Sequence, residues 1–430
     1  MSADLPFEPP RRTPLFSHDK RSEYTILCPQ MAPLHFDLLQ AVFTTYGYHL
    51  VVLPDVDRDA IEEGLRYVNN DACYPAIVVV GQLIQALKSG RYDLSRTALV
   101  ISQTCGGCRS TNYPTFLKIA AAKAGFPDIP IIPFNVNVTD AEHAGGIKVT
   151  LPMLKKLFYA FLYGDLLLYL SNRCRPYETV PGSTNALTAT WIERLRQVIL
   201  ENDRHDITGK VTRIVADFEA LELDEAKAKP RVGIVGEILV KYHPGANNDL
   251  VGLIEREGGE AVVPEILDFV LYCLTSDKHR KRYSKVPFST GLKSSLAVWI
   301  IERQREKVRR ILRGSKRFPP IGSIEHLIEK AETIVSTCNH TGEGWLLSAE
   351  MIEMIESGTP NIVCVQPFGC LPNHITGKGV MKELRIRYKN SNITTIDYDP
   401  GTTEVNQLNR IKLMMAVANK NLTRRPPPTP

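Results

Sequence analysis

Residues 24–55 read YTILCPQMAPLHFDLLQAVFTTYGYHLVVLPD, and this stretch decides the fold. Its first seven residues, YTILCPQ, form a short apolar run that is typical of a strand. Residues 33–48, PLHFDLLQAVFTTYGY, space their apolar side chains as an amphipathic helix does, and HLVVLPD at 49–55 indicates a second strand. We therefore expect a β-α-β unit, in which a helix joins two parallel strands.

The alternation of strand and helix continues beyond this unit. Apolar patterns predict a helix that begins near Tyr74, a strand at 97–103, a helix at 115–125 and a strand at 129–135. Residues 150–226 change to mostly helical patterns. Such alternation predicts a parallel sheet that is covered by helices on both faces.

A second α/β region opens after Pro230. There we expect strands at 231–240, 261–266, 361–369 and 392–400, with only a loop between the last two, and helices at 247–259, 292–312, 346–358 and 403–420. The expected fold class is α/β, with two Rossmann- or flavodoxin-like parallel-sheet lobes joined by a helical region. The expected divisions are a disordered tail at 1–21, an N-terminal lobe at 22–149, a helical connector at 150–229, a C-terminal lobe at 230–420 and a disordered tail at 421–430.

Composition narrows the class of protein. The 430 residues are 43% hydrophobic and 23% charged, as in ordinary globular proteins, so a core forms without disulfides. Nine cysteines cannot all pair, and the first residues lack the apolar stretch of a secretory signal, which favours a reducing cytoplasm. The longest apolar run, 157–170, is shorter than the roughly 20 residues of a membrane span and contains Asp165, so we expect a buried helix and no membrane contact.

The positive charge of the chain is regional. Residues 278–317 contain 14 Lys and Arg but only two Glu, whereas the whole chain carries a net charge of +5. A solvated helix face explains this segment, as does a docking surface for an acidic protein or for the phosphates of coenzyme A. We expect no nucleic-acid binding, because the total charge is low and no recognised DNA or RNA module accompanies the segment.

Several cysteines stand at turns that follow strands or open helices. Cys73 precedes Tyr74-Pro75, which places it near a helix N-cap, where the helix dipole stabilises a thiolate. Cys105 and Cys108 lie in the loop QTCGGCRSTNYP, and Cys370 follows a strand that ends at Gln366. Cys338, with His340, has the same expected layout. The carboxyl ends of parallel strands meet at one edge of a sheet, so these thiols can converge between two lobes although they are far apart in sequence.

Single cysteines have simpler interpretations. We expect Cys28, Cys273 and Cys364 to be buried packing residues, and Cys174 is left undecided. The C-x-x-C pair of Cys105 and Cys108 fits a redox pair, a zinc site completed by Cys338 and His340, or a structural role.

Three stretches resemble one family. DACYPAIVVVGQLIQALKSGRYD at 71–93, CGGCRSTNYP at 105–114 and the segment from GEGWLL to NRIKLM at 342–414 are similar to the 2-hydroxyacyl-CoA dehydratase superfamily, and most similar to its activase-related branch, with a relation to double-cubane cluster proteins. The resemblance covers about residues 24–415 and is thin in the helical middle. It implies two α/β lobes with an iron–sulfur cluster held by cysteines.

The resemblance also implies which residues serve the cluster. Cys73, Cys108 and Cys370 match the ligands of a 4Fe–4S cluster. Cys105, where relatives often have Gly, is an additional ligand, an alternative ligand or a bystander. Cys338 is the next candidate, and its use would favour an 8Fe–9S cluster. Four further residues are expected to bind the cofactor through hydrogen bonds around the cluster: Arg109, Asn112, Asn373 and His374. Each of them also fits a role in stabilising its loop.

The implied activity is one-electron chemistry. A separate ATP-dependent iron–sulfur activator would deliver low-potential electrons, and an acyl-CoA substrate would be reduced or dehydrated. The chain has no phosphate-binding G-x-x-x-x-G-K-[ST] motif, which assigns ATP to the partner. A dimer is usual in the superfamily. The alternative interpretation is a non-catalytic iron–sulfur or zinc-binding protein that carries electrons or assembles with a partner.

Overall fold

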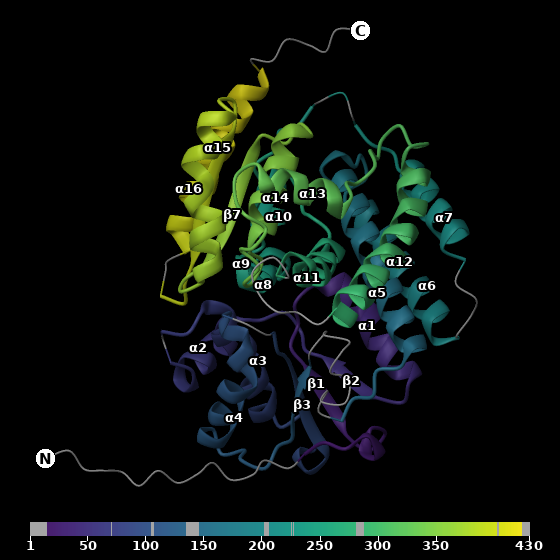
Figure 1. Cartoon of the computed structure of the whole chain (residues 1–430), viewed down its shortest axis with the longest axis vertical. Coiled ribbons are helices and arrows are strands. Elements are labelled where there is room, and N and C mark those ends of the chain that lie inside the picture. The colour runs from purple at the N-terminus through teal and green to yellow at the C-terminus, as the bar shows by residue number, and fades with distance from the viewer. Residues whose placement is uncertain are drawn as a thin grey trace, which may run out of the picture.

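Two parallel sheets form the frame of the molecule (Figure 1). The structure is a computed structural model, and each sheet within its described residues has four strands, all parallel. This confirms the predicted α/β fold with two parallel-sheet lobes. The structure describes residues 15–69, 71–104, 107–134, 146–201, 206–224, 226, 228–280, 288–401 and 404–423, with the side chains of 277–280, 288–290 and 423 left out.

The N-terminal sheet has the strand order β2-β1-β3-β4. Alternate residues of its strands enter two different cores: Leu27 and Leu99 pack with α3 and α4, whereas Ile26 and Val100 pack with α1 and the connector. Burial on both faces explains why these strands are almost wholly apolar. The elements are β1 (Thr25–Cys28), α1 (Pro33–Thr45), β2 (His49–Val52), α2 (Arg58–Tyr67), α3 (Tyr74–Lys88), β3 (Thr97–Ser102), α4 (Tyr113–Lys123) and β4 (Ile131–Phe134).

Three helices form the connector, α5 (Leu151–Cys174), α6 (Ser183–Leu200) and α7 (Ile207–Glu219). The apolar run of α5 is buried against α1, as expected. Its Asp165 accepts hydrogen bonds from the Nε2 of His35 at 2.8 Å and from the backbone N–H groups of Ile266 and Leu267 at 2.7 and 3.0 Å. One buried carboxylate therefore ties the N-terminal lobe to the first turn of α11. In the described part of the chain, no helix is long and apolar enough to cross a membrane.

The C-terminal sheet repeats the arrangement of the first, with the order β6-β5-β7-β8. Figure 1 shows this lobe above the N-terminal lobe, with α5, α6, α7 and α12 together on one side. Its elements are β5 (Arg231–Gly236), α8 (Ile238–Tyr242), α9 (Pro244–Asn247), α10 (Leu250–Arg256), β6 (Glu260–Val262), α11 (Ile266–Arg280), α12 (Phe288–Leu312), α13 (Ile324–Glu332), α14 (Trp345–Glu356), β7 (Asn361–Pro367), α15 (Met381–Arg387), β8 (Asn392–Tyr398) and α16 (Glu404–Thr423).

Some local predictions were wrong. The strand expected at 231–240 ends at Gly236, because the side chain of Glu237 caps a new helix, α8. The segment between β7 and β8 is not a simple loop but contains a π-helical turn at 373–377 and α15. Of the expected N-terminal tail, residues 15–21 include a short 3-10 helix and the buried Phe16, which packs on the N-terminal lobe. Residues 1–14 and 424–430 lie outside the described residues.

Candidate functional site

Three of the predicted cysteines stand at the facing edges of the two sheets. Cys73 is the N-cap residue of α3, Cys108 precedes the short 3-10 helix Arg109–Asn112 after β3, and Cys370 follows β7. The strand order reverses between β1 and β3 in the N-terminal lobe and between β5 and β7 in the C-terminal lobe. Ligands of open parallel sheets bind at such points, beyond the carboxyl ends of the strands.

Contacts across the lobes bring these cysteine loops together. The guanidinium of Arg109 donates a hydrogen bond to the carbonyl oxygen of Gly369, and the N–H of Tyr74 donates to the carbonyl of Phe368 at 3.4 Å. A Cβ added to Gly369 would lie 3.7 Å from the Cα of Cys73. The loop that carries Cys370 therefore rests on the loop that carries Cys73, as predicted from the sheet edges.

Each of the three sulfur atoms has a polar neighbour. The hydroxyl of Tyr113 and the Sγ of Cys73 are 3.3 Å apart, a hydrogen bond in which either atom can donate. Ser110 Oγ donates to the Sγ of Cys108 at 3.2 Å. In addition, Asn373 Nδ2 donates to the Sγ of Cys370 at 3.4 Å, as we expected for Asn373.

The thiols are less acidic than free cysteines. Burial raises the pKa of Cys73, and it does the same for the pKa values of Cys108 and Cys370. The helix N-cap position of Cys73 is confirmed. The loss of solvation is the largest influence on the pKa of this thiol and raises it, although the hydroxyl of Tyr113 and the N–H of Ala76 act in the opposite direction. A metal that binds here must displace the protons of these thiols.

Two buried glutamates stand beside the thiols. Glu237 directly follows β5 and accepts the N–H of Val240 at 2.9 Å, while Glu343 accepts the N–H of Ile238 at 3.0 Å. Burial raises the pKa of Glu237 to about 8, and the neighbouring Glu343 contributes to the shift. After burial, both carboxylates also raise the pKa of Cys108. Sequence reasoning missed both glutamates, although the position of Glu237 at the end of an apolar strand was a usable signal.

Two further buried polar groups near this region have no hydrogen-bond partner among the described residues. They are the hydroxyl of Tyr272 in α11 and the Oδ1 of Asn373. Burial raises the pKa of Tyr272. A Cβ added to Gly344 would lie 2.5 Å from the hydroxyl of Tyr272, so this hydroxyl lies beside the backbone next to Glu343. Unpaired buried polar atoms are rare in folded proteins and favour a bound group or water at this place.

The other predicted polar residues take different positions. His374 Nδ1 is 2.7 Å from the carbonyl of Cys370, and its Nε2 is 2.8 Å from the side-chain nitrogen of Gln366, so the ring braces the Cys370 loop. Arg109 bridges the lobes instead of contacting a sulfur. Asn112 ends its 3-10 helix, and its side chain does not cap α4.

The loop of Cys338 lies near the site, but the element that precedes it is not the expected one. It follows the helix α13 instead of a strand, and Cys338 is half-buried. Thr341 in the same loop approaches Gly107, because a Cβ on that glycine would lie 3.5 Å from the Cγ2 of Thr341. His340 Nδ1 is bonded to the carbonyl of Cys338 at 2.7 Å. Cys105 lies outside the described residues, so the zinc set and the C-x-x-C redox pair stay predictions.

The remaining cysteines divide as follows. Cys364 is buried inside β7, and burial raises its pKa to about 12, which confirms a packing role. Cys28 is half-buried, and burial also raises its pKa to about 12. Cys174 is fully buried at the end of α5. The burial predicted for Cys273 was wrong, because this residue of α11 is exposed. In the described ranges, no three Cys, His, Asp or Glu side chains are grouped to hold a single metal ion.

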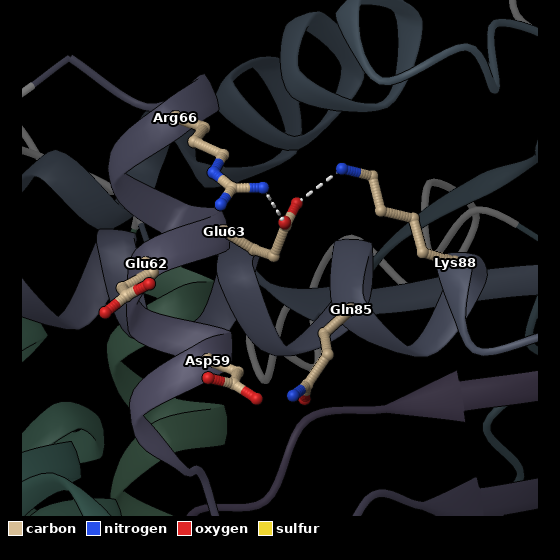
Figure 2. A pocket seen from close by; sticks show the side chains of 6 residues that line it. All are labelled: Asp59, Glu62, Glu63, Arg66, Gln85 and Lys88. Atoms are coloured by element: carbon tan, nitrogen blue, oxygen red, sulfur yellow. Dashed lines mark hydrogen bonds and ion pairs between the residues drawn. The ribbon is translucent and has the colours of Figure 1, made fainter.

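A surface hollow of about 250 Å³ lies elsewhere on the N-terminal lobe (Figure 2). Glu63 forms ion pairs with both Arg66 and Lys88 at 2.6 Å, so the charges of this hollow largely satisfy one another. Lys88 is the last residue of α3 and Cys73 precedes the first, a separation of roughly 20 Å along the helix axis. The hollow is therefore separate from the cysteine site. Its lining residues are Asp59, Glu62, Glu63, Arg66, Gln85 and Lys88.

Comparison with known proteins adds no assignment. No protein-family model matches the chain, and no curated protein matches it. The family resemblance of the three sequence stretches therefore remains a prediction.

Proposed function

We propose that the chain is an iron–sulfur protein that holds a cluster between its two lobes through Cys73, Cys108 and Cys370, and that it receives low-potential electrons from a separate ATP-dependent activator. The observation that carries the proposal is the meeting of these three cysteine loops at the facing carboxyl edges of two parallel sheets. The family resemblance supplies the kind of cluster and the kind of partner.

The residues present fit a cluster. Iron–sulfur clusters take thiolate ligands, and hydrogen bonds to the sulfurs tune their potential. Each candidate thiol has such a neighbour in Tyr113, Ser110 or Asn373. Cys73 and Cys370 are only 6% and 8% exposed, so a bound group would be screened from water. When bound, the cluster would supply one-electron transfer at low potential.

The protein groups around the thiols have defined tasks in this proposal. The hydrogen bond from Arg109 to the carbonyl of Gly369 holds the loop of Cys108 against the loop of Cys370. Burial keeps a proton on Glu237 at neutral pH, because its pKa is raised to about 8. That proton lies inside a site shielded from solvent, where it is available to a bound substrate.

The proposed reaction is the reduction or dehydration of an acyl-CoA, by resemblance to the 2-hydroxyacyl-CoA dehydratase component. We further propose that the protein works as a dimer in the cytoplasm, and that Cys105 and Cys338 enlarge the cluster to 8Fe–9S if both are ligands. The three thiols support the cluster, and the substrate class rests on the resemblance alone.

Anaerobic preparation followed by iron, sulfide and zinc analysis and EPR tests the proposal. We expect a brown protein with about four Fe per chain, or about eight if Cys105 and Cys338 take part. Cys73→Ser, Cys108→Ser and Cys370→Ser should each lose most of the iron, whereas the exposed Cys273→Ser is the matched control and should keep it.

Three outcomes would change the assignment. Zinc without iron under strict anaerobiosis would contradict the proposal. Iron that is retained after substitution of all three cysteines would contradict the ligand set. Iron with no turnover in the presence of a reduced activator and acyl-CoA would instead identify an electron carrier.

A further inference from the structure

The outward face of α12 carries an apolar row followed by a basic row. Leu292, Leu296, Trp299 and Ile300 are 63%, 56%, 56% and 47% exposed. Their spacing of three and four residues places them on one side of the helix, and Arg303, Lys307 and Arg310 continue the same side towards its C-terminus. We call these seven residues the outer stripe; they are Leu292, Leu296, Trp299, Ile300, Arg303, Lys307 and Arg310.

Apart from Lys293, the basic residues of α12 fall into two sets. Arg305 is buried and paired with Glu265, Asp268 and Glu302, and Arg309 pairs with Glu302 and Glu306 at 2.7 and 2.8 Å.

By contrast, the cations of the outer stripe have no ion pair with any described residue, since the carboxylates around α12 pair with Arg305, Arg309 and Arg313. Arg303 instead lies over the ring of Trp299, with its guanidinium carbon 5.2 Å from the ring centre. The uncompensated charge of the helix is thus concentrated on its outer side.

The outer stripe is not needed to hold α12 in place. The opposite side of the helix packs through Val298 and Ile301 against the buried cluster that contains Tyr272 and Trp345. Inward ion pairs of Arg305 and Arg309 secure the following turns. The apolar half of the stripe is therefore free to serve contact with another molecule, and a continuous apolar row on a surface is typical of an interaction site.

Charge selects the kind of occupant. A second copy of the chain would bring two segments 278–317 together, each with 14 Lys and Arg against two Glu, and their repulsion opposes that pairing. A helix that lies in a lipid surface separates apolar and basic residues around its circumference. Here they are separated along one side, which suits a protein surface that presents apolar side chains next to carboxylates.

We propose that the outer stripe of α12 docks an acidic surface of the electron-donating partner protein, with Leu292, Leu296, Trp299 and Ile300 as the apolar contact and Arg303, Lys307 and Arg310 facing carboxylates. This proposal rests on the proposed function for the identity of the partner. Its place in the fold is suitable, because α12 packs on α11, and the hydroxyl of Tyr272 in α11 lies beside Gly344, the residue that follows Glu343 of the thiol site.

Binding of the purified ATP-dependent activator, measured by titration calorimetry, is the primary test. The parent protein should bind, and added salt should weaken binding. Leu296→Asp and Trp299→Asp should each raise Kd by at least about 30-fold, as loss of a central apolar contact does, and the double charge reversal Arg303→Glu with Lys307→Glu should raise it by about tenfold. Leu413→Asp, a change at a 69% exposed residue of α16, is the matched control and should bind like the parent.

A second measurement separates this proposal from the proposed function. In the holoprotein, stripe variants should lose reduction by the activator but keep reduction by a strong small-molecule reductant such as titanium(III) citrate, which needs no docking surface. A chain that holds no iron–sulfur cluster would contradict the proposed function, whereas the calorimetric result would still stand. The docking proposal would be overturned if the stripe variants bound the activator with the same Kd as Leu413→Asp. It would also be overturned if the stripe variants altered only dimerisation or binding to phosphatidylglycerol vesicles.

Discussion

Tyr113 connects the packing of the N-terminal lobe to the thiol site. Tyr113 is buried and is the first residue of α4. Its hydroxyl lies 3.3 Å from the Sγ of Cys73, the N-cap residue of α3. Burial and the nearby Cys73 raise the pKa of Tyr113, so it stays a phenol at all working pH values. With a thiolate in place, the hydroxyl can only donate, and the hydrogen bond becomes charge-assisted.

Tyr113→Phe removes this donor and keeps the ring. A hydrogen bond to a cluster sulfur stabilises the reduced, more negative state, so its loss should lower the midpoint potential. If the bond contributes about 1 kcal/mol, the shift is about 40 mV for one electron. Potentiometric EPR titration of the anaerobic protein measures it, with Tyr159→Phe in α5 as the control. An unchanged potential with unchanged iron would show that Tyr113 has only a packing role.

At the scale of elements, two glycines decide how closely α2 and α3 approach. A Cβ on Gly81 of α3 would overlap the carbonyl oxygen of Ala60 in α2 and lie 2.7 Å from the nitrogen of Gly64. A Cβ on Gly64 would overlap the carbonyl oxygen of Ile77. The two backbones therefore touch without intervening side chains, and this contact orients α3, whose N-terminus presents Cys73.

Gly81→Ala should force α2 and α3 apart. We expect the free energy of unfolding to fall by about 1 to 3 kcal/mol, the usual cost of overpacking, even though alanine favours the helix itself. Denaturant unfolding monitored by circular dichroism measures the change. Gly401→Ala is the control, because its Cβ would have an ordinary contact of 3.4 Å with Asp399. Equal stability of the two variants would show that the helices separate without cost.

At the scale of the whole molecule, His243 lies where the lobes meet. It is fully buried between α8 and α9, and its Nε2 accepts the N–H of Val56 from the N-terminal lobe at 3.4 Å. Burial lowers its pKa from 6.5 to about 4. The carboxylate of Asp55 is 3.9 Å from its Nδ1, but the loss of solvation outweighs that attraction.

The pH dependence of stability should report this histidine. Between pH 6.5 and 4 the unfolded chain binds a proton on His243 that the folded chain does not, so the free energy of unfolding falls as the pH is lowered, by up to about 1.4 kcal/mol per pH unit. In His243→Asn this contribution disappears. Urea unfolding at pH 7, 6, 5 and 4 measures the free energy of unfolding of the parent and of the variant. Burial raises the pKa of Asp55, which makes an opposite contribution to the pH dependence. This contribution is present in both proteins and cancels when their free energies are subtracted. Parallel curves would contradict the assignment.

The sequence alone determined the features that depend on neighbours along the chain. The alternation of strand and helix in residues 24–55 predicted the first unit of a parallel sheet, because side-chain period and apolar runs are local properties. The pair Tyr74-Pro75 placed Cys73 at a helix N-cap for the same reason. A general rule of parallel sheets predicted that Cys73, Cys108 and Cys370 converge, and Gly369 brings the loop of Cys370 against Cys73 and Arg109.

Only the tertiary structure decided which groups surround those thiols. Glu237 and Glu343 are 106 residues apart, and each accepts a hydrogen bond from the first turn of α8, a pairing that no local pattern indicates. The same holds for the basic residues of α12, which looked uniform in the sequence. Contacts with Glu265 and Asp268 bury Arg305, whereas Arg303 stays on the surface. Long-range packing determines burial, and burial decides which charges are neutralised and which remain available to a partner.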